Sequence, residues 1–417
     1  MKPKVHIFSA IFALSAVIGA PSTSNADVVT DWNEITVNAT SVTPARPGPS
    51  NLLDIAAVHL AVYDAVQAYT HDYRPYCNDI QGASGSPQAA AARAAYDVLK
   101  ARLTSAEQIA FIDDAYANYL VTHGISPMDA GTQVGSAAAS CINAMRAGDG
   151  SFPVGYPPFW GGTSLGQWRP TVVVPPIPSM ASPWLGSVAP YTIKSPAQFR
   201  PGPPPALDSP EYTRDYNEVR SIGASNSTTR TPEQTEIGNF WNLNYQAVLN
   251  RMLRDLSTEH VDNISDSSRL FALSSSATAD AIIAAWDSKL EYNLWRPITA
   301  IHNGELDGNP RTEGDAAWNS LIPNPPYPDY TSGANAVMAA STRAAQLFFG
   351  ENEMTVVVKK TPAGPTRTFH KFTDLRDEVV EARIYGGIHF RFADTAGRKQ
   401  GEHIAQWTNG HFFKPVE

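Results

Sequence analysis

Long apolar segments are nearly absent from this sequence of 417 residues. Beyond residue 26, no run approaches the ~18 to 20 apolar residues that a membrane-spanning helix requires. Cations are in the minority, with 31 Lys and Arg against 40 Asp and Glu and a formal net charge of -9. Proteins that follow nucleic-acid phosphates normally present a basic stripe. We therefore expect no nucleic-acid partner, and no membrane span in the mature chain.

Residues 1–26 have the pattern of a secretory signal peptide. Two lysines precede an apolar run over residues 5–19, and the sequence Ser-Asn-Ala ends at Ala26. The run is too short for a spanning helix, and its flanks suit cleavage. We expect a periplasmic or extracellular protein, with an uncleaved anchor as the alternative.

Cysteine is also scarce, since Cys77 and Cys141 are the only two. In an oxidising compartment they could form one disulfide. Two buried thiols fit the sequence equally well, because spacing does not show that the two Cα atoms come close.

The sequence favours helices on both sides of an irregular region. In an N-terminal helical half, about 50–147, apolar residues recur with helical period over 52–68, and the segments 87–119 and 129–147 are rich in alanine. Residues 148–230 are rich in Pro, Gly and Trp, which predicts a long ordered loop region packed over the core.

A C-terminal helical half, about 231–417, follows an N-cap signal at Thr231. We expect one domain over 27–417, mainly α, with at most a small β-hairpin around residues 361–364. The expected helices are 232–255, 264–294, 334–348, 374–386 and 396–408, and the expected strands are 354–360 and 367–372.

Three motifs in this half carry residues that suit an oxyanion. Lys289 and Arg296 are seven positions apart, nearly two helical turns, which predicts that both cations project from one face. Pro297 disfavours helical geometry at Arg296 and so places it at the helix end. The alternative is two solvated cations near a helix C-terminus.

In the second motif, Ser332 and Gly333 stand at a helix start, where a hydroxyl and free N–H groups can hold an anion. A plain N-cap is the alternative for the serine. In the third, Arg383 and His389 flank two glycines that can bend the backbone between them. A core histidine is the alternative there.

Together, Lys-x6-Arg-Pro, a Ser-Gly step and Arg-x5-His resemble the vanadium-dependent haloperoxidases and the related type 2 phosphatidic acid phosphatases. The likeness to the bacterial secreted haloperoxidase branch covers most of the mature chain. It runs through VVTDWNEI, VHLAVYDAV, GQWRP, RTPEQTEI, WDSKLEYNLWRPITAI and RIYGGIHFRF.

The resemblance implies a helical bundle with vanadate as cofactor, or with no cofactor and a phosphate ester as substrate. Lys289, Arg296 and Arg383 would neutralise the oxyanion, and Ser332 with the Gly333 N–H would donate hydrogen bonds to it. His389 would bind vanadium as the metal ligand, or attack phosphorus. The implied small-molecule substrates are hydrogen peroxide, halide and an organic acceptor, or a phosphate ester. A homodimer stays open.

Two positions depart from the family pattern. Ala334 replaces a histidine that handles protons, and Ala393 replaces an acidic residue, with Asp394 one position late. Loss of an acid–base group typically costs ~10² to 10⁴ in rate. His302 and Glu305 are candidate replacements. The sequence therefore predicts a haloperoxidase with altered or weakened activity; a phosphatase on phosphomonoesters or a non-catalytic oxyanion-binding protein are the alternatives.

Overall fold

The structure is a computed structural model that describes residues 27–41, 48–171 and 178–416. The expected signal peptide, residues 1–26, lies outside these ranges. Within them, no helix combines the length and the apolarity needed to cross a membrane. The fold is mainly helical with one two-stranded antiparallel sheet, as the sequence predicted.

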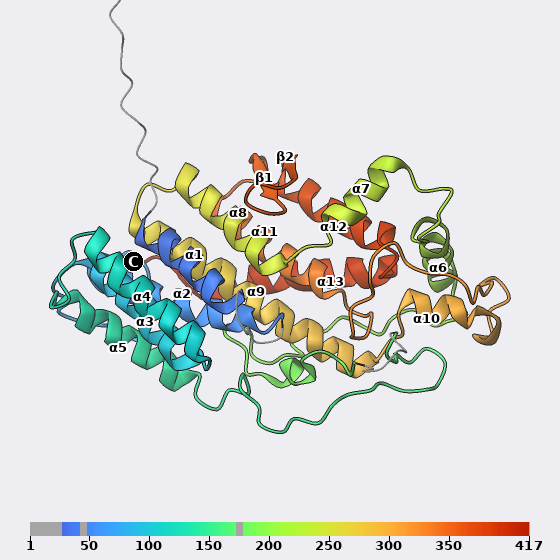
Figure 1. Ribbon diagram of the computed structural model, residues 1–417, viewed down its shortest axis with the longest axis horizontal. Coiled ribbons are helices and arrows are strands. Elements are labelled where there is room, and N and C mark those ends of the chain that lie inside the picture. The colour runs from blue at the N-terminus through green and yellow to red at the C-terminus, as the bar shows by residue number, and fades with distance from the viewer. Residues whose placement is uncertain (1–26, 42–47, 172–177, 417) are drawn as a thin grey trace, which may run out of the picture.

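The longest helix, α9 (Ile264–Tyr292), runs through the middle of the molecule (Figure 1) and packs against α2, α11 and α13. It is buried on nearly every side, as expected of a helix whose small and apolar residues leave no polar face. The helices packed on it are α2 (Asn51–Thr70), α11 (Gly333–Phe349) and α13 (Arg391–His411).

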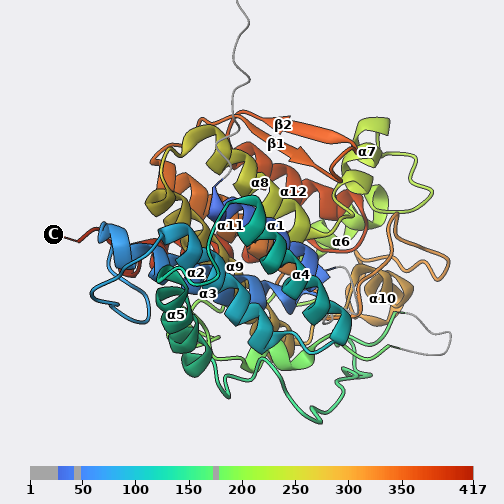
Figure 2. The ribbon, with the colours of Figure 1, turned by 60° about the vertical axis from the view of Figure 1, so that its left-hand side comes forward.

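The N-terminal helices gather at one end of α9, on the left of Figure 1 and toward the viewer in Figure 2. Cys77, in the loop after α2, forms a disulfide with Cys141 of α5, so the bridge that the sequence left open is present. The helices of this end, besides α2, are α1 (Val28–Ser41), α3 (Pro87–Arg102), α4 (Ala106–Thr122) and α5 (Gly131–Met145).

The prediction of a single helix over 232–255 was wrong, and the alanine-rich segment 87–119 also contains parts of two helices. Ser105 accepts a hydrogen bond from the Gln108 N–H and starts α4 as a new helix. Asn244 does the same for the Ala247 N–H. It thereby separates α7 (Pro232–Phe240) from α8 (Tyr245–His260). Short polar side chains favour a cap over continuing a helix.

The irregular region after residue 148 is mostly loop, but it contains the short 3₁₀ helix η1 (Pro183–Ser187) and the helix α6 (Pro210–Ile222), which the sequence reading missed. Its buried Trp168 donates its backbone N–H to the carbonyl of Asn293, at 2.7 Å. The loop is thereby attached to the C-terminal end of α9.

Glycines bring α13 into close contact with the start of α11. A Cβ atom on Gly397 would lie 2.3 Å from the carbonyl oxygen of Ser332, and one on Gly401 would lie 2.1 Å from that of Ala336. Only glycine fits at such distances, so these two positions determine where Ser332 sits.

The remaining elements surround the contact between α11 and α13. The hairpin of β1 (Val356–Lys359) and β2 (Thr366–Phe369) confirms the predicted strands. The other elements are α10 (Pro297–His302), η2 (Gly304–Leu306) and α12 (Phe372–Tyr385).

Candidate oxyanion site

Lys289 and Arg296 come together through a turn rather than along one helix face. Asn293 adopts the left-handed conformation (φ 44°) and ends α9 after Tyr292, and Arg296 directly precedes Pro297 at the first turn of α10. The predicted helix therefore ends earlier than expected, and the seven-residue spacing does not describe the geometry. The turn still directs both side chains inward.

Lys289 is fully buried and holds the loop before α11. Its Nζ donates to the carbonyl oxygens of Pro328 and Asp329, at 2.7 and 3.1 Å. It also lies 5.0 Å from the centre of the Tyr327 ring. Burial, with the charge of Arg296 nearby, lowers its pKa well below the ordinary value. The ammonium ion is therefore costly here unless an anion is also present.

Arg296 is also fully buried, and one of its nitrogens has no protein partner. Its Nε donates to the Tyr327 carbonyl at 2.8 Å and its Nη1 to the Ile388 carbonyl at 2.7 Å. Within the described residues, Nη2 has no hydrogen-bond acceptor. An unsatisfied buried donor on a cation is unfavourable and indicates a site for an acceptor.

Ser332 caps α11 by position only. Its hydroxyl accepts no backbone N–H from the first turn of that helix, so it is not a plain side-chain N-cap. It instead accepts a hydrogen bond of 3.3 Å from Asn335 Nδ2. The next residue, Gly333, packs against Trp286, whose Cζ3 would lie 2.9 Å from a Cβ at that position.

Arg383 and His389 are joined by the bend that the two glycines predicted. Arg383 lies in the last turn of α12, and Gly387, with φ 76°, turns the chain away from the helix. His389 therefore lies in the linker before α13, with its Nε2 3.1 Å from Arg296 Nη1. Arg383 Nη1 donates to the Trp241 carbonyl at 3.2 Å, and its buried Nε has no acceptor in the described part of the chain.

The sequence reading missed one residue of the site, Asp329. Its Oδ1 lies 2.7 Å from Nδ1 of His389, and its Oδ2 accepts the Phe390 N–H at 3.3 Å. This contact supplies the tautomer-fixing partner that His389 appeared to lack when only Ala393 was considered. The signal was an acid in the Pro-Tyr-Pro-Asp-Tyr-Thr-Ser approach to α11, three residues before Ser332.

Burial and the surrounding cations determine the protonation of His389. Burial, then the charges of Arg296, Lys289 and Arg383, lowers the pKa of His389 well below its ordinary value, so the ring is neutral. Burial raises the pKa of Asp329 to about 7. A neutral ring that donates from Nδ1 to Asp329 keeps its lone pair on Nε2, on the side of Arg296.

The two proposed replacements for the missing histidine have structural contacts instead. His302 Nε2 lies 2.7 Å from the Trp318 carbonyl, and Glu305 accepts the Gly314 N–H at 3.1 Å. Neither contacts a residue of the site described above.

A cavity of about 480 Å³ leads to the start of α11. Gly333, Ala334 and Arg383 line it, so the position of the missing histidine faces this space. Its walls include the aromatic rings of Trp286, Tyr327 and Tyr245. Such walls exclude water and strengthen the interaction of an anion with the cations.

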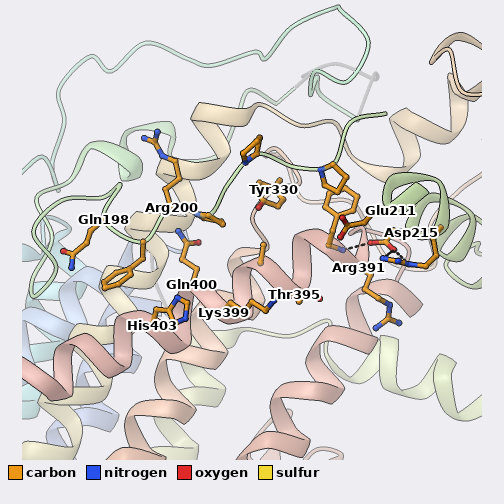
Figure 3. Close-up of a pocket in the computed structure, with 17 residues that line it drawn as sticks. Gln198, Arg200, Glu211, Asp215, Tyr330, Arg391, Thr395, Lys399, Gln400 and His403 are labelled. Carbon is orange, nitrogen blue, oxygen red and sulfur yellow. Dashed lines mark hydrogen bonds and ion pairs between the residues drawn. The ribbon is translucent and has the colours of Figure 1, made fainter. Parts of the chain in front are cut away.

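A larger cavity, of about 710 Å³, lies elsewhere and contains none of the predicted site residues. Figure 3 shows Thr395, Lys399 and His403 of α13 along one side of it. Two of its arginines are neutralised, because Arg200 pairs with Asp287 at 2.7 Å and Arg391 with Glu218 at 2.7 Å. Its size therefore does not make it the better candidate for an oxyanion.

The chain is similar to known proteins over most of its length. Residues 269–417 match the VCPO second helical-bundle domain family. The chain is 25% identical to the vanadium chloroperoxidase of Curvularia inaequalis over an alignment of 499 positions, which covers 91% of this chain and 81% of that protein.

Two solved structures share the fold. A bacterial vanadium-dependent iodoperoxidase has a TM-score of 0.75 and 23% identity, over 94% of this chain and 97% of its own. An apo-type bacterial vanadium-dependent chloroperoxidase has a TM-score of 0.70 and 19% identity, over 91% and 96% respectively. At these identities the structural likeness establishes the fold alone.

Proposed function

We propose that this chain, which is similar to the vanadium haloperoxidases named above, binds vanadate and oxidises halide with hydrogen peroxide. The observation that carries the proposal is the group of three buried cations that converge around His389. Lys289, Arg296 and Arg383 come from α9, the turn after it and α12. No single local motif would bring them together.

The residues present fit an oxyanion. Arg296 Nη2 and Arg383 Nε are buried donors with no acceptor in the described chain, and a bound oxyanion would satisfy them. The Gly333 N–H, at the first turn of α11, and the Ser332 hydroxyl would donate to the same ligand. Vanadate and phosphate share this requirement, since both are small oxyanions with several acceptor oxygens.

His389 fits the role of the metal ligand. Its neutral ring, held by Asp329 through Nδ1, would present the Nε2 lone pair to vanadium. A carboxylate on the far nitrogen of a ligating histidine fixes the ring and raises its basicity. When bound, vanadate supplies Lewis-acid activation of hydrogen peroxide toward halide.

The chain itself contributes charge, orientation and exclusion of water. The three cations would withdraw electron density from the oxyanion, and this effect is strong because aromatic walls lower the local dielectric. Asp329 keeps the imidazole in one orientation. The organic acceptor would meet oxidised halide in the cavity of about 480 Å³ that Ala334 lines.

The test is reconstitution of purified protein with orthovanadate, followed by peroxide-dependent oxidation of iodide and bromide. We expect oxidation that requires vanadate and is lost in Arg296→Met. Vanadate binding without halide oxidation would contradict the proposal. Hydrolysis of a phosphomonoester by the vanadate-free protein would instead favour a phosphatase, and phosphate binding with neither activity would favour an oxyanion-binding protein.

A further inference from the structure

Two residues that stand one position away from the family pattern contact each other in this chain. Asn335 follows the position of the missing histidine, and Asp394 follows the position of the missing acid. Asn335 Nδ2 donates to Asp394 Oδ1 at 2.8 Å, and the same amide lies 3.3 Å from the Ser332 hydroxyl. The carboxyl group of Asp394 is thus next to the hydroxyl proposed to hold the oxyanion.

Asp394 lies in the first turn of α13, pressed against the start of α11 by the glycine contacts described above. Its side chain is fully buried, and its Oδ2 has no well-formed hydrogen bond within the described residues. A buried carboxylate with an unsatisfied oxygen is strongly disfavoured, whereas a carboxylic acid can use that oxygen as a donor. The geometry therefore favours a protonated side chain.

Some groups around Asp394 raise its pKa and others lower it. Burial raises its pKa well above the ordinary value, and Asp329 raises it further. The hydrogen bonds from Ser332 and Asn335 and the charge of Arg383 lower it, but burial is the largest effect. The other titratable groups that interact with Asp394 from neighbouring elements are Lys289, Arg296 and Tyr245.

The other side chains of the site are less suited to donate a proton, and Asp329 is held by His389 and the Phe390 N–H. The Ala334 side chain has no ionisable proton, and the His302 ring is hydrogen-bonded to the Trp318 carbonyl. The Tyr245 hydroxyl is directed at the Trp241 carbonyl, 3.2 Å away. Lys289 already donates to two carbonyl groups.

We propose that Asp394 is the proton source of the oxyanion site and acts through the Ser332 hydroxyl, in place of the histidine that position 334 lacks. The O–H bond of Asp394 breaks as its proton passes to Ser332 Oγ, while the original hydroxyl proton of Ser332 passes to an oxygen of the bound oxyanion. The Asp394 carboxylate is then reprotonated through Ser332 from a hydronium ion of the solvent. This inference rests on the proposed function, because it assumes that the oxyanion lies at Ser332.

The first test measures binding and does not require activity. Affinities for orthophosphate and orthovanadate are measured by titration calorimetry from pH 5 to pH 9, for the wild type and for Asp394→Asn. Ionised Asp394 would repel the anion. Above the pKa of Asp394, the wild-type affinity should therefore fall about tenfold more per pH unit than that of the variant, which corresponds to one linked proton.

Asp215→Asn is the matched control. Asp215 of α6 is also a fully buried carboxyl; it accepts the N–H of Phe392, at the start of α13, at 2.8 Å, but it contacts none of the proposed site residues. Its variant should follow the wild-type pH dependence. Identical pH dependence in wild type and Asp394→Asn would overturn the proposal, whether or not the protein oxidises halide.

The second test uses the vanadate-loaded protein. Asp394→Asn should lower halide oxidation by ~10² to 10⁴ while it keeps the wild-type anion affinity at pH 5. Ala334→His in the same background should restore much of the rate, because it supplies a separate proton donor. Unchanged turnover in Asp394→Asn, or parallel loss of affinity and turnover without rescue, would show that Asp394 has no such role. A wild type that binds vanadate but oxidises no halide would refute the proposed function alone.

Discussion

Two buried polar clusters lie on the same helix, α9, and they differ in how far their hydrogen bonds are satisfied. Near the middle of the helix, Asp280 accepts hydrogen bonds from the backbone of residues 191–193 and from the Thr192 hydroxyl, at 2.6 to 3.0 Å. At its C-terminal end, Lys289 lies in the proposed oxyanion site, where buried nitrogens of Arg296 and Arg383 have no acceptor among the described residues.

The difference separates a structural cluster from a binding site. The Asp280 cluster attaches the irregular region to the core and leaves no room for a ligand, because its acceptors are used by the protein. The proposed oxyanion site keeps three cations and free donors together, and Asp329, 3.5 Å from Arg296, offsets only part of their cost in stability. Burial alone therefore does not distinguish the two clusters; the donors without acceptors on Arg296 and Arg383 do.

The largest effect on anion binding is expected from Lys289→Met. Removing one buried cation from the site should weaken vanadate binding by ~10² to 10³, since truncating one partner of a buried charge interaction costs about 2–5 kcal/mol. Stability should change less than affinity, because the desolvation cost of the buried ammonium is removed together with its hydrogen bonds to the Pro328 and Asp329 carbonyls. Vanadate titration and urea unfolding of the same variant measure both quantities. Unaltered vanadate affinity would place the anion elsewhere.

Asp329→Asn is expected to have the next largest effect. The amide cannot accept the Nδ1 proton with the same strength, so His389 should lose its preferred orientation and basicity. Changes to such partners of a ligating histidine typically cost 10- to 100-fold, as an order of magnitude, in metal affinity or activity. Vanadate binding and halide oxidation are the measurements. Phosphate affinity, which does not depend on a metal bond, should fall less, and an equal loss for both anions would argue against ligation by His389.

The complementary change, Asp280→Asn, should affect stability only. The amide has one acceptor oxygen for the donors that now share two, so the free energy of unfolding should fall by about 1–3 kcal/mol. Vanadate affinity should stay at the wild-type value, because Asp280 contacts none of the site residues. Denaturant unfolding tests the first expectation and calorimetry the second; weaker binding in this variant would show that the two clusters are coupled.

A smaller, pH-dependent effect is expected at Asp64 of α2, another carboxyl in a structural role. It accepts the backbone N–H groups of Tyr76 and Cys77, and burial raises its pKa from 3.8 to about 6. A raised pKa means that the folded state binds the proton more tightly than the unfolded state. The contribution of Asp64 to stability is therefore fully present below pH 4 and is lost as the pH rises to about 6. Urea unfolding at several pH values should show this decline, and Asp64→Asn should lack it.

The fold was largely predictable because it follows from local chemistry. The apolar period over residues 52–68 and the glycines at 386 and 387 describe short-range preferences, and the structure agrees with both. The predictions failed where a cap competes with helix continuation. Ser105 and Asn244 end a helical pattern whose periodicity alone would continue it.

The site was predictable only in part. Lys289, Arg296, Ser332, Arg383 and His389 were identified by their motifs, and the structure brings them together, but the roles assigned to them remain predictions. Asp329 was missed because an aspartate in a proline-rich loop usually faces water. Asp394 was identified but judged to be one position too late for a role. Its contact with Asn335 could not be foreseen, because the two residues are 59 positions apart in the sequence.

The sequence by itself determined the helical class and the set of cationic and hydroxyl side chains suited to an oxyanion, because periodicity, caps and motifs act over a few residues. Only the tertiary structure decided which acids face those cations and which donors are left without acceptors. That outcome depends on the crossing of α11 and α13 at Gly397, and on the turn that ends α9 at Asn293. Hydrogen-bond satisfaction is a property of the packed interior, where each group has only the partners that the fold provides.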